Sequence, residues 1–144
     1  MHEIKTLGSG ASAIVKSCYV NGWICAMKEI DIRGCEVPRA EISLLEKLPL
    51  HENFVQYFFH RELLEEQKLQ IFLKQYSGTL LQVIEKRSEQ EQPFTPVEIV
   101  RILLDIASGL VFLHGHNVIH RDMKSENIFV THTKDATKMT CAIG

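Results

Sequence analysis

The segment that most restricts the fold is TPVEIVRILLDIASGLVFLH, residues 95–114. Thr95, Pro96 and Glu98 form a capping box with proline at the first helical position, which predicts that a helix begins here. The other positions are apolar or small, apart from one narrow polar stripe, so other elements must cover this helix on several sides. The stretch after it, residues 115–144, is too short to do so. The polar stripe consists of Glu98, Arg101, Asp105 and Ser108.

The composition and charge of the chain exclude several classes of protein. At 144 residues it has room for one modest domain, and its formal net charge of −2 lacks the basic surface that nucleic-acid binding needs. No apolar run is long enough for a transmembrane helix, and the start, MHEIKTLGSG, has no signal-peptide pattern. The cysteines form no CxxC pair and are typical of reduced thiols. We therefore expect a cytoplasmic protein that binds neither nucleic acid nor membrane. The cysteines are Cys18, Cys25, Cys35 and Cys141.

The first third of the chain has the pattern of three antiparallel strands, over residues 4–7, 14–20 and 23–30. Asn21 and Gly22 separate the second run from the third. Asn-Gly between two strand-like runs is a strong hairpin signal, because both central residues of a type I′ turn need a positive φ.

Two opposite charges lie on neighbouring predicted elements. Strand periodicity places Lys28 on one face with Ile24, Ala26 and Ile30. A helix is predicted between Pro38 and Pro49, and helical spacing places Glu41 on one stripe with three leucines. Glu41 therefore either points inward and pairs with Lys28 or lies exposed at the edge of the stripe, and periodicity favours neither. The leucines are Leu44, Leu45 and Leu48.

The middle of the chain predicts two further strands, residues 53–59 and 69–73, and a short helix over 80–86. The polar run RSEQEQ, residues 87–92, predicts an exposed loop before the long helix.

A glycine-containing loop, GSGASAIV at residues 8–15, lies between the first two predicted strands. Glycines let a backbone approach a ligand closely and offer N–H groups to phosphate oxygens. Taken alone, such a loop is more often a simple turn than a phosphate-binding loop. The loop is not a dinucleotide-binding fingerprint, because a strand follows it, and the chain has no GK[ST] phosphate loop.

The densest group of polar residues is IHRDMKSENIFV, residues 119–130. Asp122 could accept a proton from an alcohol, and Lys124 could neutralise phosphate charge. The carbonyl oxygen of Asn127 suits a hard Mg²⁺ ion. Phosphoryl transfer needs these parts. The nearby histidines, His114, His116 and His120, fit no zinc pattern.

HRDMKSEN resembles the catalytic loop HRDxKxxN of eukaryotic protein kinases at every specified position. GSGASAIV is similar to their glycine-rich loop, with Ala13 in place of the third glycine. CAMK resembles the VAIK strand that carries the phosphate-binding Lys28, and Glu41 matches the helix glutamate that pairs with that lysine. The resemblance implies an α+β, two-lobed kinase-like fold. We expect an N-lobe over residues 1–76, with a five-stranded antiparallel sheet and one helix, and the first helical part of a C-lobe over 77–144.

The resemblance also implies a function and a set of site residues. The function is transfer of the γ-phosphate of MgATP to a protein hydroxyl. Lys124 is typical of serine/threonine kinases, and the chain is most similar to NIMA-related and MAP-kinase-kinase-kinase types. The implied catalytic residues are Asp122 and Lys124, and Asn127 is the implied metal ligand. Nucleotide binding is implied for Leu7, Gly8, Ser9, Gly10, Ala11, Ser12, Val15, Ala26, Lys28, Glu41, Leu73, Lys74, Gln75 and Phe129.

The end of the given sequence, TCAIG, resembles the strand that leads into the kinase DFG segment. The aspartate of that segment holds the catalytic magnesium. We therefore expect a partial domain that is inactive or nearly so by itself, and whose later helices would cover the apolar helix. The alternative is a kinase-fold module that binds nucleotide or a protein without catalysis.

Overall fold

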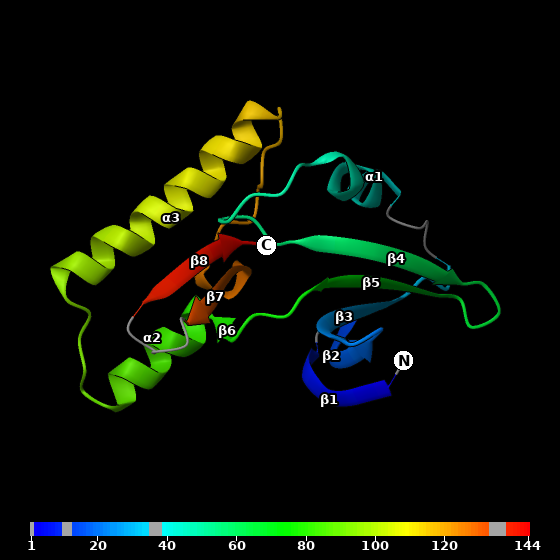
Figure 1. Cartoon of the computed structure of the whole chain (residues 1–144), viewed down its shortest axis with the longest axis horizontal. Coiled ribbons are helices and arrows are strands. Elements are labelled where there is room, and N and C mark those ends of the chain that lie inside the picture. The colour runs from blue at the N-terminus through cyan, green and yellow to red at the C-terminus, as the bar shows by residue number, and fades with distance from the viewer. Residues whose placement is uncertain (1, 10–12, 35–38, 133–137) are drawn as a thin grey trace. The chain divides into compact units, whose positions relative to one another are not determined.

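The computed structural model describes residues 2–9, 13–34, 39–132 and 138–144, and the chain divides into two compact units. Unit 1 comprises residues 1–49 and 56–75, and unit 2 comprises residues 50–55 and 76–144. The architecture is that of a partial kinase-like fold, as the sequence predicts: unit 1 holds a five-stranded sheet with one helix, and unit 2 holds the first C-lobe elements (Figure 1).

Unit 1 is built on an antiparallel sheet in the order β1-β2-β3-β5-β4. The fourth strand begins later than predicted, because the segment before it belongs to unit 2. The elements are β1 (His2–Ser9), β2 (Ala13–Val20), β3 (Trp23–Asp31), α1 (Arg39–Lys47), β4 (Tyr57–Leu63) and β5 (Lys68–Lys74).

The predicted turn between β2 and β3 is confirmed. Asn21 has φ 47° and Gly22 has φ 90°, so both central residues adopt the positive values that a type I′ turn requires. The turn sets the register of β2 against β3. Val20 lies opposite Trp23 beside the turn, and the pairs continue without a shift to Ala13 opposite Ile30.

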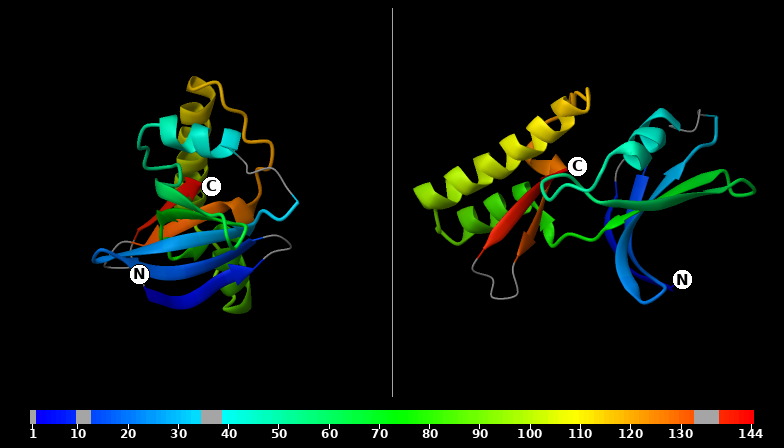
Figure 2. Two further views of the ribbon diagram at one scale, coloured as in Figure 1. Left: turned by 90° about the vertical axis from the view of Figure 1, so that its right-hand side faces the viewer. Right: turned by 45° about the horizontal axis from the view of Figure 1, so that its top comes forward.

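The two faces of the sheet in unit 1 have separate cores. Cys18, Cys25, Met27 and Phe72 are buried on one face. On the other face Leu69 and Ile71 pack against Ile42 of α1. Figure 2 shows this helix, in cyan, beside the sheet. Ile24 lies near the hairpin turn and is 56% exposed.

Helix α1 buries a different residue from the one that its leucine spacing indicated. Ile42 is buried and packs against Leu69 and Ile71 of β5, so it marks the inner side of the helix. Glu41 precedes Ile42 and is therefore turned about 100° away from that side. Glu41 is exposed, which contradicts the inward orientation and agrees with the alternative at the edge of the stripe.

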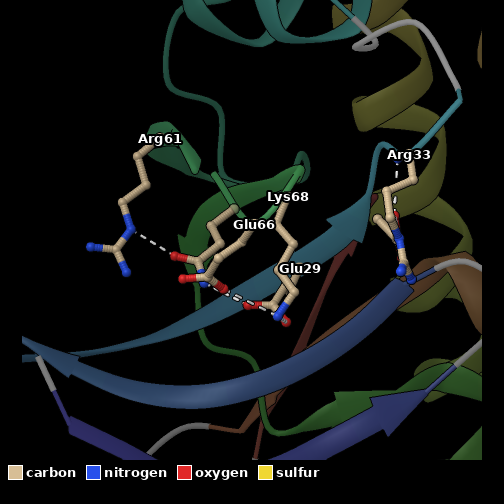
Figure 3. A network of polar contacts seen from close by, with 7 residues as sticks. Glu29, Arg33, Arg61, Glu66 and Lys68 are labelled. Atoms are coloured by element: carbon tan, nitrogen blue, oxygen red, sulfur yellow. Dashed lines mark hydrogen bonds and ion pairs between the residues drawn. The ribbon is translucent and has the colours of Figure 1, made fainter. Parts of the chain in front are cut away.

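A chain of polar contacts joins β3, β4 and β5 (Figure 3). Arg61 Nε donates to Gln70 Oε1 at 2.6 Å, and Gln70 Nε2 donates to Glu29 Oε2 at 2.6 Å. Lys68 Nζ lies 3.2 Å from Glu29 Oε1. Burial opposes ionisation of Glu29, but the hydrogen bonds from Gln70 and Lys68 outweigh it and lower the pKa of this carboxyl. The network keeps Gln70, 3% exposed, fully hydrogen-bonded within the sheet.

Unit 2 contains a three-stranded antiparallel sheet, β6-β7-β8, flanked by helices (Figure 1). Side chains from α2, α3, β7 and β8 form its core. Helix α2 extends to Glu89, so the first residues of the predicted exposed loop are helical. The elements are β6 (Gly78–Thr79), α2 (Leu80–Glu89), α3 (Pro96–Gly115), the short 3₁₀ helix η1 (Ser125–Asn127), β7 (Ile128–His132) and β8 (Met139–Ile143).

Helix α3 begins as predicted. Thr95 Oγ1 accepts from the Glu98 backbone N–H, and the Glu98 carboxylate accepts from the Thr95 N–H. Only Gly109 and Leu113 of this helix are buried, so the predicted lack of cover is confirmed for residues 1–144. No helix in the described ranges is both long and apolar enough to cross a membrane. The apolar residues of α3 that are 45% to 71% exposed are Val97, Ile99, Val100, Leu103, Leu104 and Val111.

Candidate active site

The three residues with the clearest chemistry, Asp122, Lys124 and Asn127, lie together in unit 2. Asn127 Nδ2 donates to Asp122 Oδ2 at 3.0 Å and to the Asp122 carbonyl oxygen at 2.9 Å. Lys124 Nζ is 3.6 Å from Asp122 Oδ2. The Asp122 carboxylate is thus oriented by an amide and accompanied by a positive charge.

The backbone around Asp122 has an unusual conformation. Arg121 has φ 67°, in the left-handed region that residues other than glycine rarely adopt. The Asp122 N–H donates to His120 Nδ1 at 3.2 Å. The Asp122 side chain is 66% exposed, so a ligand hydroxyl has access to its carboxylate.

The loop is joined to the end of β8 by two further contacts. His120 Nε2 lies 3.0 Å from the Gly144 carbonyl oxygen, and the Gly144 N–H donates to the Asn127 carbonyl oxygen at 2.9 Å. A Cβ at Gly144 would lie 2.4 Å from Phe129 Cε2, so this close approach requires glycine. Gly144 therefore contacts three residues of this region: it forms hydrogen bonds with His120 and Asn127 and packs against the ring of Phe129.

Two residues that the sequence did not assign to the site hold β8 in place. Asp105 Oδ2 accepts from the Cys141 N–H at 2.8 Å, and Asn53 Nδ2 donates to the Cys141 carbonyl oxygen at 2.9 Å. Asn53 is 7% exposed, and its own carbonyl oxygen accepts from the Ile143 N–H. The only sequence signal for Asp105 was a carboxylate in the middle of an apolar helix. No sequence signal marked Asn53, because it stood at the start of a predicted strand.

The contacts between Asn53 and β8 attach the segment Leu50–Val55 to unit 2. Its Val55 N–H donates to the Ile143 carbonyl oxygen at 2.9 Å. His51 stacks on Phe112 of α3, with ring centroids 4.5 Å apart. Burial and the nearby Asp105 raise the pKa of the Cys141 thiol to about 11, so this cysteine is a neutral packing residue.

In unit 1, sheet register places four of the candidate nucleotide-binding residues on one face. Val15 lies opposite Lys28, and Ala26 lies opposite Leu73. Directly opposite residues, and residues two apart along a strand, project to the same side of a sheet. All four are half-buried. This face therefore combines a small apolar surface with one lysine.

Lys28 and Glu41 form no ion pair within the described ranges of the chain, although both belong to unit 1. Lys28 is half-buried on β3, whereas Glu41 is exposed on α1. The residues are present, but this conformation does not bring them together.

The predicted glycine-rich loop is only partly described. Leu7, Gly8 and Ser9 end β1, and Gly8 lies opposite Val15. No atom lies within 4 Å of where a Cβ of Gly8 would stand, so the loop backbone is accessible there. Gly10, Ala11 and Ser12 lie outside the described residues.

The remaining nucleotide candidates end unit 1 and begin β7. The Lys74 N–H donates to the Gln56 carbonyl oxygen at 2.8 Å, and Gln75 accepts a side-chain hydrogen bond from Ser17. In unit 2 Phe129 lies opposite Ala142, and its ring centroid is 5.7 Å from that of Tyr76.

The donor set around Asn127 fits a magnesium ion. Its amide nitrogen is turned toward Asp122, which directs the amide oxygen away from that residue as a possible metal ligand. Mg²⁺ prefers oxygen ligands and commonly takes only one or two from the protein, the rest being water and substrate phosphate.

Comparison with known proteins identifies the family of the chain. Residues 1–140 match the protein kinase domain family. The chain is 37% identical over 130 residues to the kinase and exchange factor for Rac B of Dictyostelium discoideum, covering 85% of this chain and 11% of that protein. It is 35% identical over 136 residues to mitogen-activated protein kinase kinase kinase 3 of Arabidopsis thaliana, covering 88% of this chain and 21% of that one.

A third relative is the probable serine/threonine-protein kinase nek3 of Dictyostelium discoideum, 29% identical over 137 residues, which cover 90% of this chain and 12% of that protein. The chain thus spans about a tenth to a fifth of the length of these relatives. The family match extends over both units and includes the Asp122 loop. The chain therefore belongs to the protein kinase family.

Proposed function

We propose that the protein transfers the γ-phosphate of MgATP to a serine or threonine hydroxyl of a protein substrate. The observation that carries this proposal is the cluster of Asp122, Lys124 and Asn127, which supplies a candidate base, a phosphate-neutralising charge and a metal ligand. Lys124 supports serine/threonine specificity through its resemblance to that class. The name of one relative, the probable serine/threonine-protein kinase nek3 of Dictyostelium discoideum, points the same way.

Asp122 would accept the proton of the attacking hydroxyl. Asn127 occupies one carboxylate oxygen with its N–H and so orients the other toward a substrate. Lys124, within 3.6 Å of the same carboxylate, would neutralise charge on the transferring phosphate. Phosphoryl transfer depends on such positioning and electrostatic stabilisation.

Lys28 would bind the nucleotide phosphates, while Val15, Ala26 and Leu73 would contact the adenine. Phe129 would contribute a further apolar surface. A magnesium ion held in part by Asn127 Oδ1 would reduce the negative charge of the phosphates. We further propose a cytoplasmic location, which reduced Cys18, Cys25 and Cys141 support.

We infer that residues 1–144, expressed alone, bind MgATP but transfer phosphate poorly. The support is that Asn127 is the one predicted metal ligand in residues 1–144. Kinases use a second ligand as well, the aspartate of the DFG segment. A nucleotide-binding module without catalysis would give the same binding and no transfer.

Nucleotide binding is tested by thermal unfolding of residues 1–144 with MgATP, with ATP plus EDTA, and without ligand. We expect MgATP to raise the melting temperature, EDTA to reduce that rise, and Lys28→Ala to abolish it. Lys47→Ala, which removes an exposed lysine from α1, is the matched control and should respond like the unaltered chain. An equal melting temperature in all three conditions would exclude nucleotide binding.

Catalysis is tested with labelled MgATP and peptides that offer serine, threonine or tyrosine. Residues 1–144 should transfer no more label than their Asp122→Asn variant. Robust transfer that Asp122→Asn abolishes would contradict the inference of an inactive fragment and assign catalysis to these residues. Transfer to tyrosine alone would contradict the proposed specificity.

A further inference from the structure

A buried hydroxyl in β2 makes a hydrogen bond that the resemblance to kinases did not predict. Ser17 Oγ donates to Gln75 Oε1 at 2.7 Å, and the two residues are 58 positions apart in the sequence. Ser17 is only 4% exposed, so water cannot readily replace this bond. Gln75 is half-buried at the end of unit 1.

Sheet register places Ser17 beside the candidate adenine-binding residues. Ser17 lies opposite Ala26, which in turn lies opposite Leu73. These three form one row across neighbouring strands. The next row along, which begins with Val15 and Lys28, projects to the same face. The Ser17 hydroxyl is therefore a polar group in an otherwise apolar row.

The segment Lys74–Gln75 is consequently fixed at two points within unit 1. Its backbone is held where the Lys74 N–H donates to the Gln56 carbonyl oxygen at 2.8 Å. Its side chain is held by Ser17. Hydrogen bonds to the edge of a base require donors and acceptors at set positions and angles, so a backbone fixed beforehand binds more tightly than a mobile one.

We propose that Ser17 is a positioning residue for adenine recognition: its hydroxyl fixes Gln75, and thereby the backbone of Lys74 and Gln75, in a conformation that accepts the base. The inference rests on the proposed binding of MgATP. Alanine or valine at position 17 would preserve the strand but leave the Gln75 amide oxygen without its donor. The role concerns the base and not the phosphates, which Lys28 would contact.

The test compares two probes, MgATP and magnesium tripolyphosphate, by titration calorimetry on residues 1–144. Ser17→Ala should weaken MgATP binding about fivefold to tenfold, the loss expected for one partly buried hydrogen bond, and leave tripolyphosphate binding within about twofold. Ser17→Thr keeps the hydroxyl and should restore MgATP binding. Ser43→Ala, the same substitution on α1, should change neither affinity.

Equal weakening of both probes by Ser17→Ala would overturn the positioning role, because a general structural defect acts on both. Unchanged MgATP affinity in Ser17→Ala would overturn that role alone. If the unaltered chain binds neither probe, both this inference and the proposed nucleotide binding are wrong.

A second variant guards against misfolding of Ser17→Ala. Gln75→Ala removes the same bond from its other partner and should weaken MgATP binding to a similar extent. The double variant should be no weaker than either single variant, because both remove one interaction. Additive losses would overturn the proposal. Amide hydrogen exchange at Lys74 and Gln75 should accelerate in both single variants, and unchanged exchange would equally contradict it.

Discussion

The Asp122 loop of unit 2 and the strands of unit 1 that carry candidate nucleotide-binding residues position these residues by different means. Asp122, Lys124 and Asn127 are neighbours in sequence and bond to one another. Val15 and Lys28 come from separate strands and share a face only because the β2–β3 register pairs them. The first group depends on specific hydrogen bonds, and the second depends on the sheet as a whole.

This difference implies different sensitivities to mutation. A loop held by a few specific hydrogen bonds should respond when one of them is removed. A face defined by strand register should tolerate the loss of any one side chain that projects from it, because backbone hydrogen bonds maintain the register. Substitutions that test the supports of unit 2 against matched positions therefore test the comparison directly.

The largest effect is expected for Gly109→Ala in α3. A Cβ there would lie 2.4 Å from the Asn53 carbonyl oxygen and 2.8 Å from Ile143 Cδ1, so α3 or the backbone of Asn53 must shift. Such overpacking costs about 3 kcal/mol of unfolding free energy. Urea denaturation followed by circular dichroism measures it.

The matched control is Gly115→Ala in the last turn of the same helix, where a Cβ meets no atom within 4 Å. This variant should unfold at the same urea concentration as the unaltered chain, or slightly above it. If Gly109→Ala and Gly115→Ala behave alike, close packing of α3 against the Asn53 segment does not support unit 2.

The second largest effect is expected for Asn53→Ala. The substitution leaves the Cys141 carbonyl oxygen without its donor in a buried setting, which costs about 2 kcal/mol. Denaturation midpoints measure the loss. Glu52→Ala, at the exposed neighbouring position, should change the midpoint little. Equal midpoints for the two variants would show that the Asn53 amide does not stabilise β8.

Local sequence patterns predicted the elements of both units well. The Asn21-Gly22 turn and the capping box of α3 are short-range signals, and both are confirmed. Periodicity left the orientation of Glu41 open, because the leucine stripe includes it only at an edge, and contacts with β5 then bury Ile42 instead. Periodicity reports which faces a helix has but not which face meets a neighbour.

The supports of the site were not predictable in the same way. The bond from Asn53 to Cys141 joins residues 88 apart, and that from Ser17 to Gln75 joins residues 58 apart. No local pattern marks such pairs, because their partners are backbone groups or a single amide brought close only by the completed fold. The proximity of Asp122, Lys124 and Asn127 was predictable because these residues lie within one short motif.

A smaller effect separates the two groups of candidate residues from each other. Asn127→Ala removes both N–H donations to Asp122 and should lower the unfolding free energy by about 1 kcal/mol. Lys28→Ala should change it by less than about 0.5 kcal/mol, because register and not its ammonium group holds β3. Hydrogen exchange of residues 120–127 should increase only in Asn127→Ala. A larger stability loss in Lys28→Ala would contradict the comparison.

The smallest effect concerns pH and contrasts one acidic residue from each unit. The pKa of Glu98 falls from 4.5 to about 2, chiefly through the Arg87 hydrogen bond and also through Thr95. The pKa of Asp31 falls to about 2 through Arg33. A carboxyl whose pKa is lower in the folded state stabilises the fold above its unfolded pKa, and this stabilisation is lost as pH falls through the folded pKa.

The two carboxyls should nevertheless differ. Arg33 is two residues from Asp31, so their contact persists in part in the unfolded chain. It therefore lowers the pKa of Asp31 in the unfolded state as well as in the folded state. Arg87 lies on α2, eleven residues before Glu98, and meets it only in the folded unit. Glu98→Gln should therefore flatten the fall in denaturation midpoint between pH 4.5 and about 2, whereas Asp31→Asn should flatten it less. If Asp31→Asn flattens it more, local sequence proximity does not determine which ion pair stabilises the fold.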